Sequence, residues 1–138
     1  MKDFQGLQIR RRSIRKYKNE QLTPEETKKI LEAALLSPTS KNKHSWTFIA
    51  VEDKGTIAKL SECKPHSASF ISDAPLVVVV AGNPLISDAY VEDASIAAFN
   101  MQLQAEELNI GSCWIQVRNR SFSDKITSGE YINDLLDI

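Results

Sequence analysis

Cysteine, histidine and glycine are scarce in this sequence, and their positions exclude several kinds of site. The two cysteines, Cys63 and Cys113, stand fifty positions apart, which fits neither a zinc clip nor a redox pair. The two histidines, His44 and His66, have no further ligand at metal-binding spacing, so we predict no metal site and expect both in loops or on the surface. The five glycines are isolated, which excludes a glycine-rich dinucleotide-binding fingerprint.

Long apolar runs are lacking as well. The longest, Ala74–Ala81, has eight residues including Pro75, whereas a membrane-spanning helix needs about 20. The N-terminus shows no signal-peptide pattern, and the low cysteine content suits a reducing compartment. We therefore expect a cytoplasmic protein without a membrane partner.

Length and charge narrow the class of protein further. A chain of 138 residues with 42% hydrophobic and 25% charged residues fits one domain, residues 1–138, that can bury a core without disulfide bonds or structural metal ions. The net charge of −1 argues against a dedicated nucleic-acid binder, because such proteins are usually basic.

The N-terminal part of the sequence predicts two helices. The stretch up to Ile9 has apolar residues at helical spacing. A second helix follows Thr23, which acts as N-cap, with Pro24 in the first turn and Glu26 completing a capping box. Its apolar face consists of Ile30, Leu31, Ala34 and Leu35, and Pro38 ends it.

The middle of the sequence predicts two strands. Trp46–Glu52 is rich in large and branched residues and predicts a strand, and a helix is expected over Lys54–Glu62. Pro65–Asp73 is ambiguous and is compatible with a short helix. Pro75–Ala81 predicts a further strand, and its uninterrupted valines predict burial on both faces.

The longest expected helix covers Asp88–Asn109, with Asp88 as its cap. It is apolar almost all round, which is typical of a buried helix. Small residues would let another helix approach closely; they are Ala94, Ala97, Ala98 and Ala105.

The C-terminal part is expected to begin with a turn at Gly111. A strand over Ser112–Val117 follows, then a helix over Ser123–Asp137 with a break near Gly129. Helices interleaved with short strands favour an α/β or α+β sandwich. Three strands make a thin sheet, so either more strand is supplied from elsewhere or the chain stops early.

Residues 10–18 form a cationic stretch in which six of nine residues are arginine or lysine. Such a stretch is compatible with a solvated basic segment or a nucleic-acid patch. The acidic remainder of the chain opposes binding of a polyanion. Planar guanidinium groups beside a serine hydroxyl are better suited to binding a single phosphate group than a nucleic acid.

A polar loop over residues 37–46 separates the second helix from the first strand. Loops in such positions commonly carry binding groups. Hydroxyl and amide groups from Thr39, Ser40 and Asn42 can satisfy the donors and acceptors of a flat heterocycle.

Together these segments resemble the nitroreductase family, and the resemblance covers nearly the whole chain. The family pattern Arg-[Arg/His]-Ser-x-[Arg/Lys] is matched by Arg11, Arg12, Ser13 and Arg15. The family's loop before the first strand is matched by Pro38, Thr39, Ser40, Asn42 and Trp46. Downstream, Asp73-Ala-Pro with its valine run, Asp93 to Asn100, and Gly111 to Ile115 resemble the central strand, the long dimer helix and the strand after it.

The resemblance implies an α+β sandwich with a mixed sheet flanked by helices, in an intertwined homodimer that binds FMN at the subunit interface. It implies that the flavin's phosphate, ribityl chain and ring edge are held by Arg11, Arg12, Ser13 and Arg15. The isoalloxazine would be contacted from the other subunit by Pro38, Thr39, Ser40 and Asn42. The implied activity is a ping-pong transfer of electrons from NADH or NADPH to a nitroaromatic, quinone or similar acceptor. The flavin carries this chemistry, so no side chain is nominated as catalytic.

Two departures from the family pattern concern the site. His44 replaces the usual glutamine and Ser45 the usual proline, and we expect these changes to loosen the loop or alter its ring contacts. Family chains also normally continue with a strand and a basic Lys-x-Arg-like element, so a chain ending at Ile138 is expected to be C-terminally incomplete.

The alternatives are a flavin-binding or scaffold-only member without turnover and, more remotely, a nucleic-acid module that uses Arg10–Lys18. A nucleophilic role for Cys113 would need a positioned base, and none is visible in the sequence. We therefore expect Cys113 in the core.

Overall fold

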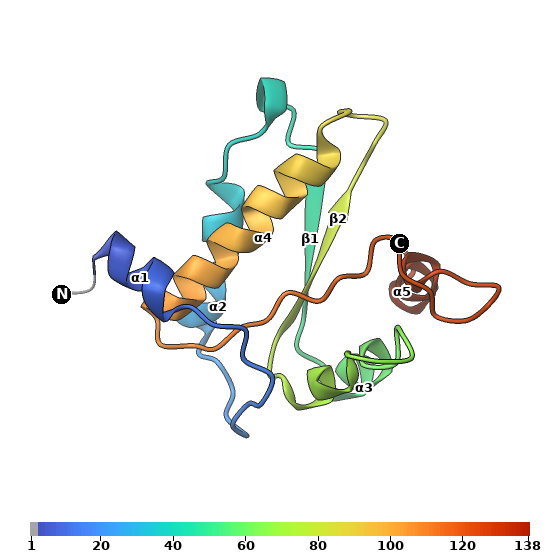
Figure 1. The fold of residues 1–138 in the computed structure, drawn as a ribbon, viewed down its shortest axis with the longest axis horizontal. Helices are drawn as coiled ribbons and strands as arrows, with labels where there is room; N and C mark the ends of the chain where they lie inside the picture. Colours follow the sequence, from blue (N-terminus) through green and yellow to red (C-terminus); the bar gives the residue numbers. More distant parts are fainter. Residues whose placement is uncertain (1–2) are drawn as a thin grey trace. The chain divides into compact units, whose positions relative to one another are not determined.

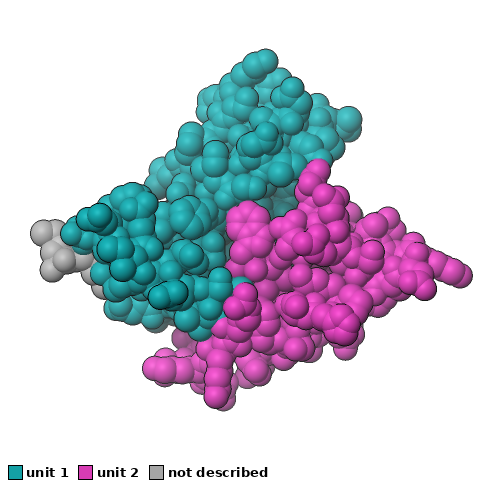
Figure 2. Space-filling view, viewed as in Figure 1, with its two compact units in different colours: residues 1–14, 22–50, 78–113 teal, residues 15–21, 51–77, 114–138 magenta. Residues whose placement is uncertain are grey.

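The computed structural model describes residues 3–138, which form helices and a pair of strands (Figure 1). In chain order the elements are α1 (Phe4–Arg10), α2 (Pro24–Leu35), the 3-10 helix η1 (Ser40–Asn42), β1 (Trp46–Val51), α3 (Lys54–Leu60), the 3-10 helix η2 (Ser69–Asp73), β2 (Val77–Gly82), α4 (Tyr90–Glu107) and α5 (Ser128–Leu136). The chain divides into two compact units (Figure 2). Unit 1 contains residues 1–14, 22–50 and 78–113, and unit 2 contains residues 15–21, 51–77 and 114–138.

The first two helices begin at side chains that satisfy free backbone donors. Asp3 accepts the Gly6 N–H at 2.6 Å at the start of α1. At α2 the predicted capping box is complete: Thr23 Oγ1 accepts the Glu26 N–H at 3.1 Å, and Glu26 Oε1 accepts the Thr23 N–H at 2.8 Å. Both helices are therefore fixed locally by their own sequence.

Thr23→Ala is expected to lower the free energy of unfolding by about 1 kcal/mol, because the Glu26 N–H loses its acceptor. Thr23→Ser keeps the hydroxyl and should lie within about 0.5 kcal/mol of the wild type. Urea unfolding followed by circular dichroism measures both values. Equal stabilities for the two variants would contradict this role of the cap.

The two strands form an antiparallel pair. The Asn83 N–H, just after β2, donates to the Ser45 carbonyl, just before β1, at 2.9 Å. Both strands were predicted, but the burial of β2 on both faces was wrong, because Val77 to Ala81 are only half-buried. Burial on both faces would need a packed layer on each side of the sheet, and the packing seen here is that of Val78 and Val80 against the core between α2 and α4.

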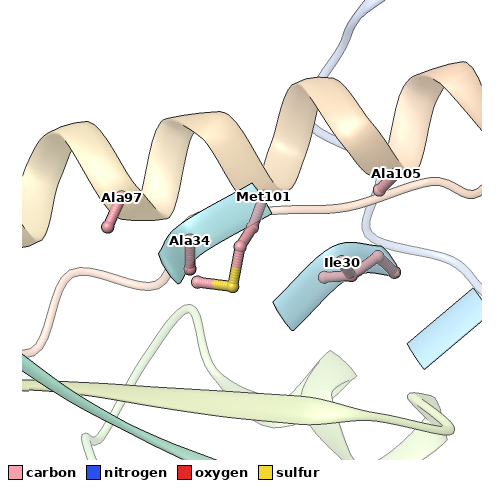
Figure 3. Close-up of a cluster of buried hydrophobic side chains, with 5 residues drawn as sticks. All are labelled: Ile30, Ala34, Ala97, Met101 and Ala105. Atoms are coloured by element: carbon pink, nitrogen blue, oxygen red, sulfur yellow. The ribbon is translucent and has the colours of Figure 1, made fainter. Parts of the chain in front are cut away.

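The core of unit 1 lies between α2 and α4 (Figure 3). It is built from Ile30, Ala34, Ala97, Met101 and Ala105. Ala34 and Ala97 are fully buried, and the small side chains let the two helices approach closely, as the sequence predicted. Trp46 and Phe48 of β1 and Val78 and Val80 of β2 pack against this cluster.

The burial predicted for the long helix is corrected by the structure. Only one stripe of α4 is buried, consisting of Asp93, Ala97, Met101 and Ala105 at intervals of four residues. On the opposite side, Ile96 and Phe99 are each 42% exposed. Asp88 is not the cap: the N-cap position is Ala89, which makes no side-chain capping bond.

The predictions of a turn at Gly111 and of a strand over Ser112–Val117 were wrong. After α4 the left-handed conformation is taken by Asn109, with φ 62°, and not by Gly111. Gly111 instead allows close approach, because a Cβ there would lie 3.0 Å from the Cβ of Ile14. Ser112–Val117 forms no strand in the described chain; its only ladder contact is an isolated parallel bridge from Ser112 to Ser13.

The last helix is shorter than expected. It begins at Ser128, where the Thr127 hydroxyl accepts the Glu130 N–H at 3.0 Å, and Gly129 lies in its first turn without breaking it. Residues 123–126 form a turn instead, in which Ser123 Oγ accepts the Ile126 N–H at 3.2 Å. A hydroxyl that bonds nearby backbone competes with helix formation in this way.

Unit 2 has its own buried side chains: Ile57, Leu60, Cys63, Ala68 and Ile71. The Tyr131 hydroxyl of α5 donates to the Lys59 carbonyl of α3 at 2.8 Å. Burial raises the pKa of the Cys63 thiol. Cys113, expected in the core, is only half-buried, whereas both histidines are exposed as predicted. None of the helices described over residues 3–138 is long and apolar enough to cross a membrane.

Candidate functional site

The arginine segment leaves α1 against the side of α4. Arg11 is the C-cap of α1, and its N–H donates to the Leu7 carbonyl at 3.0 Å. Its guanidinium carbon lies 5.8 Å from the centre of the Phe99 ring, and the side chain is half-buried. A guanidinium over an aromatic face is held by cation–π attraction, so Arg11 has a defined position.

The chain on either side of Arg11 is also anchored to unit 1. Arg10 Nε lies 4.0 Å from a carboxylate oxygen of Glu106, near the end of α4. After Ser13, the Ile14 N–H donates to the Ser112 carbonyl at 2.9 Å. The side chains of Arg12 and Ser13 are exposed, so a fixed backbone presents them to solvent.

Arg15, the fourth residue of the predicted phosphate group, lies in unit 2. Its side chain is exposed and its backbone belongs to no helix or strand. Unit 1 therefore carries three of the four residues predicted to hold the flavin's phosphate, ribityl chain and ring edge.

The polar loop begins at a buried serine. Ser37 Oγ accepts a hydrogen bond from Asn100 Nδ2 of α4 at 2.7 Å and donates to the Ala33 carbonyl at 3.1 Å. The loop is thus tied to α4 before Pro38, whose ring is exposed.

The centre of the loop has an unusual backbone conformation. Lys41, Asn42 and His44 all have positive φ, at 53°, 56° and 48°. Non-glycine residues avoid this region, and such conformations persist where the surroundings impose them. The Ser40 N–H donates to Asp93 Oδ1 of α4 at 3.0 Å, and the His44 N–H donates to Thr39 Oγ1 at 3.2 Å.

The end of the loop is fixed by β1. Ser45 is 3% exposed, and its carbonyl accepts the Asn83 N–H. The His44 ring packs edge-on against Trp46 at 5.4 Å, and Trp46 packs on Phe48 at 4.8 Å. The two residues that depart from the family pattern are therefore both held in place, one by burial and one by an aromatic contact.

Both the loop and the arginine segment are attached to helix α4, which is shown in Figure 1. The loop is attached near its N-terminus through Asp93, whereas the arginine segment contacts Phe99 and Glu106. At about 1.5 Å per residue, roughly 9 Å of helix separates Asp93 from Phe99 and roughly 20 Å separates Asp93 from Glu106. The loop is also tied to Asn100 through Ser37, so the loop and Arg11 meet α4 at neighbouring positions near its middle, whereas Arg10 reaches the end of the helix.

The sequence did not identify the residues that support the loop. In the sequence, Asp93 and Asn100 stand out only as the bounds of the segment that resembles the family's dimer helix. The available signal was their spacing: Asp93, Ala97 and Asn100 recur at intervals of four and three residues, so the carboxylate and the amide share the helix face of a small apolar residue. Over residues 3–138 no cluster of three or more His, Cys, Asp or Glu side chains could hold a metal ion.

Comparison with known proteins gives a consistent result. The sequence model of the nitroreductase family matches residues 9–64 and 60–138. A protein of Archaeoglobus fulgidus, provisionally named NADH dehydrogenase/NAD(P)H nitroreductase, is 39% identical over 114 residues, which are 80% of this chain and 65% of that protein. A similarly named protein of Methanothermobacter thermautotrophicus is 34% identical over 78% of this chain and 57% of its own length. The chain thus spans less than two thirds of these curated relatives.

The fold is shared with solved structures. An FMN-dependent nitroreductase from Clostridium difficile R20291 matches with a TM-score of 0.95 and 47% identity, over 97% of this chain and 78% of that one. A structure from Clostridium acetobutylicum, provisionally named NADH oxidase, matches with a TM-score of 0.84 and 30% identity, over 96% of this chain and 78% of that one. The predicted α+β class is confirmed by these matches.

Proposed function

Because this chain belongs to the nitroreductase family, we propose that it is an FMN-dependent oxidoreductase that takes electrons from NADH or NADPH. The electron acceptor we propose is a nitroaromatic, a quinone or a similar compound. When bound, FMN would accept a hydride from the nicotinamide and pass electrons to the acceptor in a ping-pong sequence. The protein's part is to bind and orient the cofactor.

The phosphate half of the proposed site is the arginine segment. Arg11, Arg12 and Ser13 offer guanidinium and hydroxyl donors on a backbone that α4 and Ser112 hold in place. A guanidinium can bind two phosphate oxygens at once, and these bonds are stronger than neutral ones because both groups are charged. The donors present therefore fit a phosphate monoester. We propose that Arg15 joins them at the ribityl chain or the ring edge.

The ring half of the proposed site is the loop. Pro38 offers an exposed apolar surface, and Thr39, Ser40 and Asn42 offer hydroxyl and amide groups on a backbone fixed by Asp93. These groups fit the polar edge and flat face of an isoalloxazine. We propose, as the family resemblance implies, that each flavin lies between the arginine segment of one subunit and the loop of another.

The single observation that carries this proposal is the ordered placement of both family motifs on one helix. Arg11 packs on Phe99 of α4 while Ser40 binds Asp93 of the same helix. A solvated basic segment would not need a packed guanidinium, and a plain connecting loop would not need three left-handed residues.

The first test is the absorption spectrum of the purified full chain, with its intact mass measured alongside. We expect a yellow protein whose released cofactor has the mass of FMN, and bleaching of the flavin absorbance by NADH or NADPH without oxygen. A flavin spectrum that neither nucleotide bleaches would instead indicate flavin binding without turnover. A colourless protein that ignores added FMN would overturn the proposal.

A further inference from the structure

Asp93 is a buried carboxylate with an unusual set of contacts. It is 3% exposed and lies in the first turns of α4. One oxygen, Oδ1, accepts the Ser40 N–H at 3.0 Å. The other, Oδ2, is equally enclosed and has no hydrogen-bond partner among residues 3–138. Burying a carboxylate opposes folding unless it is compensated, so its place in this core calls for a function beyond packing.

The position of Asp93 on α4 supplies part of the compensation. Negative charge is favoured near a helix N-terminus, where backbone N–H groups have no partner in the helix. Here the N-cap residue, Ala89, offers no side-chain acceptor. The carboxylate therefore lies at the favourable end of the helix, directed towards the Ser40 amide of the loop.

The loop needs an external support of this kind. Lys41 and Asn42 follow Ser40 directly, and both have the left-handed conformation that side chains with a Cβ avoid. The backbone-to-backbone hydrogen bonds within the loop run from Asn42 N–H to the Thr39 carbonyl and from Lys43 N–H to the Ser40 carbonyl, at 3.2 and 3.1 Å. The Ser40 N–H bond to Asp93 attaches this turn to the helix.

We propose that Asp93 is a positioning residue for the flavin loop: it holds the backbone of residues 39–44 in the shape in which the loop meets the isoalloxazine. This inference rests on the proposed function for the identity of the ligand. Its structural part, control of the loop by one carboxylate, does not depend on the ligand. Asp93 itself does not touch the cofactor in this assignment.

The test compares Asp93→Ala and Asp93→Asn with Glu92→Ala, a neighbouring exposed carboxylate that serves as the matched control. Hydrogen exchange of peptides covering residues 37–45 reports the loop, and peptides covering α5 report global stability. Trypsin gives a second reading, because Lys41 and Lys43 lie in the loop itself. Both measurements are made first without flavin, and FMN titration follows.

We expect Asp93→Ala to speed exchange and tryptic cleavage in the loop, to leave α5 unchanged, and to raise the FMN dissociation constant on the order of tenfold. Asp93→Asn should restore part of the loop's protection and part of the FMN affinity, because its amide oxygen still accepts the Ser40 N–H. Glu92→Ala should match the wild type. Asp93→Asn also keeps the test open if Asp93→Ala does not fold.

Three results would overturn the inference. The first is unchanged loop exchange in Asp93→Ala. The second is exchange that rises equally in the loop and in α5, which would indicate a role in overall stability alone. The third is a loosened loop with unchanged FMN affinity. If the wild type itself ignores FMN, the proposed function fails while the loop measurement still shows whether Asp93 controls the backbone.

Discussion

Arg11→Ala is expected to weaken FMN binding roughly ten- to a hundredfold. A hydrogen bond between charged groups contributes about 1.5–3 kcal/mol, and about 1.4 kcal/mol corresponds to a tenfold change in affinity. Arg11 is the strongest candidate in its segment because its guanidinium is half-buried and packed on Phe99, whereas Arg12 is exposed. A side chain that is already ordered loses less entropy on binding. Fluorescence titration of the flavin-free protein with FMN measures the effect.

Two further variants make this prediction specific. Arg11→Lys keeps the positive charge but loses the planar fork, so it should bind FMN with an affinity between those of the wild type and Arg11→Ala. Arg118→Ala removes an exposed arginine of unit 2 that is outside the candidate site and should leave affinity unchanged. An Arg11→Ala protein with wild-type affinity would remove Arg11 from the phosphate site.

The sequence predicted best those elements whose causes are local. The start of α2 depends on Thr23, Pro24 and Glu26, which lie within four residues of one another and form the box that their spacing indicates. The strand at Trp46 and the helix at Lys54 likewise follow from side chains in the segment itself. Such signals need no knowledge of what packs against them.

Two of the errors concern elements whose state depends on distant partners. Ser112–Val117 has strand-forming residues, yet a strand exists only where another chain segment pairs with it, and here only Ser13 does so. The apolar pattern of α4 predicted a helix buried almost all round, whereas only one stripe of it is buried within this chain. Pairing and burial are properties of the assembled structure, which a local pattern does not contain.

The sequence predicted candidate contact groups for the flavin, which stay a prediction, but it did not identify the residues that support the loop. The arginines, the hydroxyls and the loop amide are visible as motifs because they are groups that can bind the phosphate and the ring edge of the proposed flavin. Asp93 and Asn100 act on the loop from positions 53 and 63 residues away from their partners, Ser40 and Ser37. Their role follows only from the fold that brings α4 beside the loop.

The exposed apolar residues of α4, Ile96 and Phe99, lead to the second prediction with a large expected effect, which concerns dimer formation. Ile96 and Phe99 lie opposite the buried stripe of the helix, and an apolar helix surface of this kind is usually covered. If a second copy of the chain covers it, as the proposed function requires, Ile96→Glu places a carboxylate in an apolar interface. An unpaired buried charge costs several kcal/mol, so the dimer dissociation constant should rise about a hundredfold or more.

Ile96→Glu should therefore give a monomer that has also lost FMN, although this residue is assigned no contact with the cofactor. Flavin loss would follow because the arginine segment and the loop would no longer meet across two subunits. Sedimentation velocity and flavin absorbance in the same sample measure both effects. Ile126→Glu is the matched control, since Ile126 is 38% exposed, lies in unit 2 and undergoes the same chemical change. A monomeric Ile96→Glu protein that retains FMN would show that one chain holds the flavin alone, and a dimeric one would place the interface on another surface.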